Sequence, residues 1–213
     1  ALSQRVAVID SHRKRALDTF PELRDIAPEL DVYENLLRHW QARINLVGAS
    51  TIPELWWRHF ADSAQVLECG AGSTVWTDLG SGAGFPGMVI ALLQRKSVGG
   101  EMHLIESDQR KAAFLREVSR ETGAGVAVHC GRVESVLSTL KPDYITSRAM
   151  ASMRFLFEST RGHVENGAVD VFLKGRDVVA ELTQASIPCN FTVSIAPSRV
   201  DPDGRLVRIS LRR

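Results

Sequence analysis

The chain has 213 residues, of which 44% are hydrophobic and 24% are charged, as in ordinary soluble globular proteins. This length is enough for one well-buried α/β domain with an additional segment. The formal net charge of +1 argues against a surface that embraces much nucleic acid. Any nucleic-acid contact is therefore expected to be a local patch.

The three cysteines, Cys69, Cys130 and Cys189, are far apart and have neither zinc-ligand nor redox spacing. We therefore expect reduced thiols, a cytoplasmic protein and no bound metal. The longest apolar runs, such as residues 88–93, are too short to cross a bilayer, so no membrane association is expected.

Residues 1–68 are predicted to form a helical segment packed on the main domain. Apolar residues recur there at three- and four-residue spacing, which is typical of one buried helix face. They are Tyr33, Leu36, Leu37, Trp40, Ile44 and Val47. Pro21, Pro28 and Pro53 are expected to mark breaks between helices.

From about residue 74 the pattern changes to alternating strands and helices. The predicted strands are 74–79, 101–106, 126–130, 143–147 and 168–174, with helix-like segments between them. Five consecutive β–α units predict a parallel sheet with helices on both faces.

The C-terminal segment departs from this alternation of strands and helices. Its segments 191–200 and 205–211 are joined by an Asp-Gly turn, which favours an antiparallel hairpin. Residues 69–213 are thus predicted to form a seven-stranded, mostly parallel, Rossmann-like sheet that ends in an antiparallel hairpin. Class I methyltransferases that use S-adenosylmethionine end in this way, whereas the dinucleotide-binding half of a dehydrogenase normally does not.

A glycine-rich stretch, TDLGSGAGFPG at 77–87, follows the first predicted strand. Gly82, Gly84 and Gly87 fit the G-x-G-x-x-G pattern of dinucleotide-binding loops. Read from Asp78, the same stretch is D-x-G-x-G-x-G, the pattern of methyltransferase loops that hold S-adenosylmethionine. Asp78 favours the second interpretation, because an acid would repel the pyrophosphate of NAD but could pin the turn or meet a cationic amino group. The alternative to a ligand-binding loop is a tight strand-to-helix turn that binds no ligand. The predicted cofactor contacts are Asp78, Gly80, Ser81, Gly82, Gly84 and Phe85.

Three later strand ends carry further candidates. Glu106 closes the second strand, where a carboxylate can accept hydrogen bonds from both hydroxyls of an adenosine ribose; otherwise it is a solvent-exposed acid. Val133 and Glu134 follow the third strand, beside the expected adenine position, although Val133 could equally be a core residue. Arg148 follows the fourth strand, between cofactor and substrate, or else forms a salt bridge to a loop carboxylate.

His59 and Asp62 lie three residues apart, so they are neighbours on one helix face. They are interpreted either as an anchor for that helix or as a wall of the ligand pocket. No metal partner lies near them in the sequence.

Basic residues suggest a modest phosphate-binding patch. Lys111 lies in a run of basic residues after the second strand, Lys174 follows the fifth strand, and Arg205 and Arg208 lie in the basic tail. These four are the candidate RNA contacts, and a solvated charged face is the alternative.

Two absences limit the chemistry. After the fourth strand the chain has no D/N-P-P-Y/F motif, which argues against a typical methylase of exocyclic amines. It also has no cysteine nucleophile there for methylation at pyrimidine C5. Cys189 comes too late in the chain for that role and is expected to be a buried thiol.

With these motifs in place, the sequence resembles the RsmG family of bacterial small-subunit rRNA methyltransferases, also called glucose-inhibited division protein B. The resemblance runs from about residue 30 to 185. Its motifs, in chain order, are INLVGAS (44–50), RHFADS (58–63), DLGSGAGFPG (78–87), ESDQRKAAFL (106–115), GRVE (131–134), SRA (147–149) and FLKG (172–175). Many members have Ala at the position of Val133 and Trp-Asn at the position of Trp40-Gln41.

The resemblance implies transfer of a methyl group from S-adenosylmethionine to N7 of a guanine in the decoding-region loop of 16S rRNA. It also implies that Gly80, Phe85, Val133, Glu134 and Arg148 contact the cofactor. The expected partner is 16S rRNA, as the small ribosomal subunit or its precursor, and the protein is expected to act as a monomer. Guanine N7 has a free lone pair, so we assign no catalytic base; Arg148 could position substrate or cofactor.

Two other functions remain open at this point. The first is a methyltransferase of the same fold that acts on a small molecule or another RNA. The second is an NAD-binding oxidoreductase or a regulator that binds a cofactor without catalysis.

Overall fold

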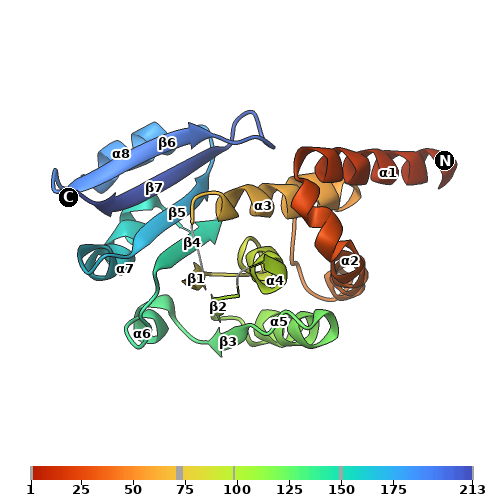
Figure 1. The fold of residues 1–213 in the computed structure, drawn as a ribbon, viewed down its shortest axis with the longest axis horizontal. Coiled ribbons are helices and arrows are strands. Elements are labelled where there is room, and N and C mark those ends of the chain that lie inside the picture. Colours follow the sequence, from red (N-terminus) through yellow and green to blue (C-terminus); the bar gives the residue numbers. More distant parts are fainter. Residues whose placement is uncertain (1, 71–73, 98, 149–150, 213) are drawn as a thin grey trace.

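The computed structural model describes residues 2–70, 74–97, 99–148 and 151–212. It is an α/β fold in which helices cover both faces of a twisted central sheet (Figure 1). The strands are β1 (Val75–Leu79), β2 (Glu101–Glu106), β3 (Ala127–Cys130), β4 (Tyr144–Arg148), β5 (Val169–Lys174), β6 (Phe191–Pro197) and β7 (Arg205–Leu211).

The strand order in the sheet is β3-β2-β1-β4-β5-β7-β6. The first five strands are parallel, and β7 runs antiparallel to both of its neighbours, β5 and β6. This confirms the predicted seven-stranded sheet and its C-terminal hairpin. The chain reverses its direction of progress across the sheet between β1 and β4, and such switch points are where open α/β sheets bind ligands.

Neighbouring residues along a strand point to opposite faces of the sheet, and each face has its own core. Leu104 of β2 belongs to the core beneath α4 (Gly87–Ser97) and α5 (Gln109–Thr122). The adjacent Ile105 belongs to the core on the other face, beneath α6 (Val133–Leu137), α7 (Met153–Glu165) and α8 (Val178–Ala185). Strands buried on both faces explain why the central segments read as almost continuous apolar runs.

The helix after β2 begins and ends at residues suited to those positions. The carboxylate of Asp108 accepts hydrogen bonds from the backbone N–H groups of Arg110 and Lys111, at 2.8 and 3.1 Å, and so caps α5. Gly123 ends the helix with a left-handed φ of 65°. The start of α5, and with it Lys111, is therefore fixed against the end of β2.

The N-terminal segment is helical but more broken than predicted. It contains α1 (Leu2–Thr19), η1 (Pro21–Ile26), α2 (Ala27–Gln41), η2 (Ala49–Glu54), η3 (Trp56–Ala61) and α3 (Asp62–Leu67). The turns η1 and η2 are 3₁₀-helical, and η3 is a turn of π-helix, a form often found at functional sites. Pro21 and Pro28 lie in the first turns of η1 and α2, whereas Pro53 lies inside η2.

The predicted apolar helix face, Tyr33 to Val47, is wrong at its C-terminal end. The helix α2 stops at Gln41, so Ile44 and Val47 lie in the following loop although both are buried. The side chain of Gln41 explains the loop: its Oε1 accepts from the backbone N–H groups of Leu46 and Val47, each at 3.0 Å. A polar side chain thus takes the place of helical acceptors for two N–H groups of the loop.

The N-terminal helices share one hydrophobic core with α4, α5 and the sheet, including Phe20, Leu30, Tyr33 and Leu37. The division of the chain at residues 68 and 69 stays a prediction. Among the described residues, no helix is long and apolar enough to span a membrane.

Candidate active site

A cavity of about 1030 Å³ lies along the carboxyl ends of the parallel strands. Its walls come from the loop after β1, the ends of β2 to β5, the loop after α2, the η3 turn and the turn between β6 and β7. Ligand pockets are typically about 300–1,000 Å³, so this cavity has room for a nucleoside-sized ligand and part of a second molecule.

The glycine-rich loop forms the floor of the cavity. Gly80 and Gly82 have left-handed φ values of 61° and 55°, which residues with a Cβ rarely adopt. The backbone N–H of Ser81 donates to the carbonyl of Ile105 at 3.0 Å, which ties the loop to β2. Gly80, Ser81, Gly82 and Phe85 all line the cavity, as the sequence pattern led us to expect.

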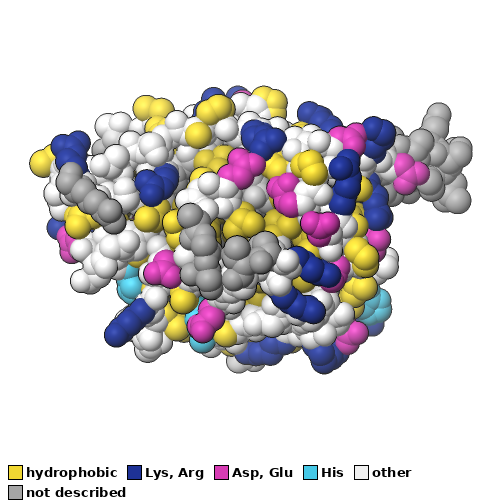
Figure 2. Space-filling view, in the orientation of Figure 1, with side chains coloured by type: hydrophobic (Ala, Val, Ile, Leu, Met, Phe, Trp, Pro, Cys, Tyr) yellow, Lys and Arg dark blue, Asp and Glu magenta, His cyan; other side chains and the backbone are white. Residues whose placement is uncertain are grey.

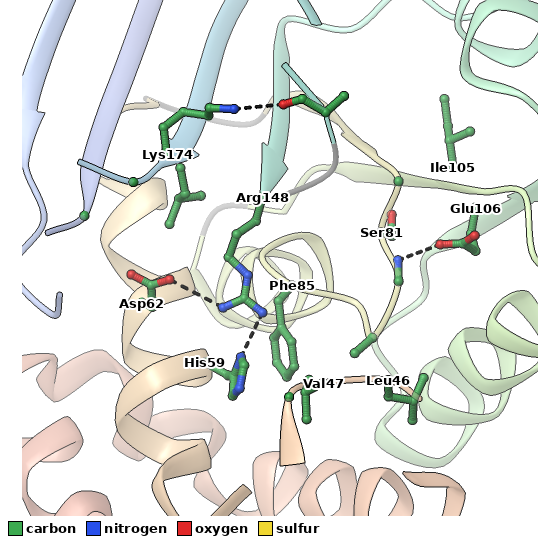
Figure 3. Close-up of a pocket in the computed structure, with 18 of the residues that line it drawn as sticks. Leu46, Val47, His59, Asp62, Ser81, Phe85, Ile105, Glu106, Arg148 and Lys174 are labelled. Atoms are coloured by element: carbon green, nitrogen blue, oxygen red, sulfur yellow. Dashed lines mark hydrogen bonds and ion pairs between the residues drawn. The ribbon is translucent and has the colours of Figure 1, made fainter. Parts of the chain in front are cut away.

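Glu106 ties the glycine-rich loop to the end of β2 through one oxygen of its carboxylate (Figure 3), while the other oxygen holds the start of α5. Oε2 accepts from the backbone N–H of Gly82 and Oε1 from that of Asp108, each at 2.8 Å. The residue lines the cavity and is only 7% exposed, which excludes the solvent-exposed alternative. Each carboxylate oxygen has lone pairs for about two hydrogen bonds, so Glu106 retains acceptor capacity for a ligand.

Two of the expected loop contacts, Asp78 and Gly84, do not line the cavity. Asp78 is completely buried, and a Cβ on Gly87 would come within 2.8 Å of its Cβ, so it packs beneath the start of α4. Its carboxylate oxygens make no well-aligned hydrogen bond in the described part of the chain. Burial raises the pKa of Asp78 to about 7. Asp78 therefore packs beneath the glycine-rich loop and does not face a ligand. Its charge no longer argues against binding of the NAD pyrophosphate.

Arg148 lies at the centre of the cavity wall (Figure 3). Its guanidinium donates to Nδ1 of His59 at 2.8 Å, and it lies 3.4 Å from a carboxylate oxygen of Asp62. The same group sits over the ring of Phe85, 5.0 Å from its centroid. The alternative role as an ion-pair partner is present, although Asp62 lies at the start of α3 and not in a loop; the place between cofactor and substrate stays a prediction. The following residue, Ala149, lies outside the described residues.

His59 is held as a neutral imidazole. Burial and the nearby charges of Arg148 and Arg58 lower its pKa to about 2. A guanidinium can only donate, so Nδ1 is the acceptor and Nε2 carries the proton. Nε2 lies 2.8 Å from Oγ1 of Thr51, and that hydroxyl in turn donates to the carbonyl of Gly48 at 2.8 Å. His59 and Asp62 are therefore both helix anchors and pocket wall.

Tyr33, which the sequence indicated only as a core residue, supports the loop. Its hydroxyl donates a hydrogen bond to the carbonyl of Ala83, and its ring stacks on Phe85 with centroids 5.3 Å apart. A Cβ on Gly84 would overlap the Tyr33 hydroxyl, which explains the glycine there. The ring of His59 also stacks on Phe85, with the ring centroids 4.9 Å apart. The N-terminal segment is thus part of the site.

Val133 and Glu134 begin α6 and both line the cavity. Val133 is 8% exposed and also belongs to the core on that face of the sheet, which confirms its role as a core residue, whereas its contact with an adenine stays a prediction. Glu134 is exposed at the rim. The N–H of Gly131 donates to the carbonyl of Glu106 at 3.0 Å, which holds this wall against β2.

The four candidate RNA contacts differ in their surroundings. Lys111, Lys174 and Arg205 line the cavity, whereas Arg208 lies mid-strand in β7, away from it. Nζ of Lys174 pairs with a carboxylate oxygen of Glu181 at 2.7 Å and donates to the carbonyl of Ala151 at 2.8 Å. This lysine is committed to the protein itself, so it is the weakest of the three as a phosphate ligand.

The cysteines stand apart from this chemistry. Cys189 is exposed, so the expected buried thiol is wrong; it lies in the irregular segment after α8, where Ile187 and not Cys189 packs against the core. No group of three His, Cys, Asp or Glu side chains suited to a metal ion occurs within the described ranges.

Comparison with known proteins gives consistent matches. Residues 26–201 match the family described as rRNA small subunit methyltransferase G. A curated relative of that description from Methylorubrum extorquens is 42% identical over 199 residues, covering 93% of this chain and 94% of the relative. Another from Rhodospirillum centenum is 46% identical over 188 residues, covering 88% and 85%.

Solved structures resemble the chain in fold alone. A precorrin-6y C5,15-methyltransferase from Geobacter metallireducens has a TM-score of 0.56 at 14% identity, covering 78% of this chain and 90% of that one. A ribosomal protein L11 methylase from Lactobacillus delbrueckii has a TM-score of 0.57 at 13% identity, covering 73% of this chain and 79% of that one.

Proposed function

The chain belongs to the rRNA small subunit methyltransferase G family, and from this premise we propose that it transfers a methyl group from S-adenosylmethionine to N7 of a guanine in the decoding-region loop of 16S rRNA. The family supports rRNA methylation with this donor; the acceptor atom and the loop are the finer part of the proposal. We further propose that the protein acts in the cytoplasm as a monomer, on the small ribosomal subunit or its precursor.

The observation that carries the proposal is the way Glu106 and the glycine-rich loop frame the switch-point cavity. Each carboxylate oxygen of Glu106 accepts one backbone hydrogen bond, from Gly82 of the loop or from Asp108 before α5, and keeps acceptor capacity for the two hydroxyls of a ribose. Gly80 and Gly82 leave the floor free of side chains, and Val133 offers apolar surface for an adenine. These residues fit S-adenosylmethionine, whose bound form supplies a methyl group on a positively charged sulfur.

The protein contributes by positioning the methyl donor and the guanine relative to each other. Guanine N7 has a lone pair at neutral pH, so no residue must remove a proton before attack and we assign no general base. Proximity and orientation supply most of the rate enhancement in such a reaction. Arg148 is suited to hold a ligand group at a fixed point, because His59, Asp62 and the Phe85 ring fix its guanidinium from three sides.

A direct test is methyl transfer from labelled S-adenosylmethionine to small ribosomal subunits that lack the native modification, followed by digestion to nucleosides. We expect the label as 7-methylguanosine from the decoding-region loop. Absence of label, on intact subunits and on assembly intermediates alike, would overturn the rRNA assignment. A methyltransferase of the same fold with another RNA or a small-molecule acceptor would then be the better interpretation.

A control variant tests whether a positive result depends on the proposed cofactor site. Glu106→Ala removes the acceptor for the backbone N–H groups of Gly82 and Asp108 and for the ribose, so it should abolish labelling while wild type labels. Competition between NAD and S-adenosylhomocysteine tests the oxidoreductase alternative, which predicts tighter binding of NAD.

A further inference from the structure

A second, smaller cleft of about 300 Å³ lies beside the main cavity. It forms where α1, the η3 turn and the segment after β6 meet, and its lining includes His12, Arg15 and Trp57. Arg58, Ser198 and Val200 line both hollows, so the second cleft and the main cavity share a wall. None of the residues assigned above to the cofactor lines the second cleft.

Arg15 is the residue of this cleft with unused hydrogen-bonding capacity. Its guanidinium lies over the ring of Trp57, 3.8 Å from the centroid, and it pairs with no carboxylate in the described part of the chain. By contrast, Arg58 pairs with Asp201 at 3.1 Å and Arg199 pairs with Glu68 at 2.5 Å. Stacking fixes the plane of the Arg15 guanidinium and leaves its N–H edges free for a ligand.

A second group in the cleft lacks a partner. Nδ1 of His12 is buried and has no hydrogen-bond partner among the described residues. One exposed cation held flat on an aromatic ring suits an anion with several oxygens. Glu54 also lines the cleft, so the net positive charge is small and the site fits one phosphate better than a run of phosphates.

We propose that this second cleft is a phosphate subsite for the RNA strand that carries the target nucleotide, with Arg15 as its principal ligand. The inference rests on the proposed function, because the shared wall lets one strand occupy both hollows with its target base in the main cavity. Figure 2 shows Lys and Arg side chains gathered where α1 meets the body of the molecule, although acidic side chains lie among them. A single well-held phosphate contact agrees with the low net charge of the chain.

The test compares two charge-removing substitutions on the same helix. Arg15→Gln removes the proposed ligand, and Lys14→Gln removes an adjacent charge that pairs with Asp18 on the exposed surface. Both side chains are exposed, so both variants should stay folded, with Arg15→Gln losing only the stabilisation of one exposed cation–π contact. The readouts are kcat/KM for methylation of unmodified subunits at several salt concentrations, and calorimetric affinity for S-adenosylhomocysteine.

For Arg15→Gln we expect about a tenfold loss of kcat/KM, as for one charge-assisted hydrogen-bonded contact, with unchanged affinity for S-adenosylhomocysteine. The slope of log kcat/KM against log salt concentration should become shallower by about one. Lys14→Gln should match wild type in both readouts. Equal behaviour of the two variants, or a loss in Arg15→Gln without a change of slope, would overturn the phosphate subsite.

A binding measurement separates this proposal from the proposed function. A fluorescein-labelled RNA hairpin that carries the decoding-region loop should bind wild type more tightly than Arg15→Gln in fluorescence anisotropy, even if wild type fails to methylate subunits. If Arg15→Gln weakens activity on whole subunits but leaves affinity for the protein-free hairpin unchanged, the cleft faces a ribosomal protein and the RNA assignment is wrong.

Discussion

The guanidinium of Arg148 donates a hydrogen bond to Nδ1 of His59 across 2.8 Å, and only an unprotonated Nδ1 can receive it. The proton of the imidazole is therefore on Nε2, toward Thr51. A histidine with this arrangement is a fixed acceptor for Arg148 at neutral pH, because burial and two arginines hold its pKa at about 2.

We predict that the acceptor at the Nδ1 position, more than the imidazole itself, sustains activity. Asn at residue 59 can put its carbonyl oxygen near that position, whereas Phe keeps the stack on Phe85 but leaves Arg148 without this acceptor. His59→Phe should lower kcat/KM by about tenfold or more, the cost of an unpaired buried donor, and His59→Asn by less. Equal losses in the two variants would contradict the prediction.

The same histidine should give the protein an acid-sensitive component of stability. In the unfolded chain its pKa is near 6.5, whereas in the folded chain it is about 2. The unfolded state thus binds a proton that the folded state does not, so stability falls as pH drops below about 6.5, by up to about 1.4 kcal/mol per pH unit from this group. Urea unfolding at pH 7 and pH 5 should show a smaller difference for His59→Phe than for wild type.

Glu106→Gln should weaken binding of S-adenosylhomocysteine by about tenfold to a hundredfold. The carboxylate now accepts from two backbone N–H groups, of Gly82 and Asp108, but a glutamine offers only one acceptor oxygen. One loop N–H would face an N–H donor, at a cost of about 1–3 kcal/mol. Glu101→Gln is the matched control, since it lies at the exposed start of the same strand. Calorimetric affinities that agree between the two variants would show that Glu106 has no such role.

The fold could largely be predicted from the sequence because its strands and turns have local signals. Short apolar runs that alternate with amphipathic segments predicted the five parallel strands, and an Asp-Gly turn predicted the hairpin of β6 and β7. The end of α2 could not be predicted, since apolar spacing continues past Gln41 into the loop. The Gln41 side chain accepts hydrogen bonds from N–H groups of that loop, a contact that apolar spacing does not reveal.

The site was predictable where a motif lies at a strand end. Glu106 and Arg148 line the cavity because the carboxyl ends of parallel strands meet at one edge. Asp78 lies at such an end too, but its side chain points beneath α4, and a strand pattern does not say which acid faces the ligand. The support from Tyr33 could not be predicted, because its partner Ala83 is 50 residues away in the chain.

Tyr33→Phe tests the hydrogen bond by which α2 holds the glycine-rich loop. The substitution keeps the ring that stacks on Phe85 and removes the hydroxyl that donates to Ala83. We expect a loss of stability of about 1 kcal/mol and several-fold weaker binding of S-adenosylhomocysteine. Tyr144→Phe is the control, because Tyr144 stacks on Trp76 outside the cavity. A loss of stability with unchanged affinity for S-adenosylhomocysteine would mean that this hydrogen bond stabilises the fold alone.

Asp170 should make the protein less stable as the pH rises. The residue is completely buried in β5; Thr160 donates to its Oδ2 at 2.7 Å, while Oδ1 has no partner among the described residues. Burial raises the pKa of Asp170 to about 8. The folded state therefore keeps a proton that the unfolded state loses near pH 4, so stability falls as pH rises between these values and levels off above about 8.

Asp170→Asn removes this titration and keeps an acceptor for Thr160. Wild type and variant should have similar unfolding free energies near pH 4, and the variant should gain on wild type with rising pH, by up to about 1.4 kcal/mol per pH unit. Urea denaturation at pH 5, 7 and 9 measures the difference directly. A constant offset across that range would mean that Asp170 does not bind its proton more tightly in the folded chain. Because Asp78 titrates in both proteins, its own raised pKa cancels in the comparison.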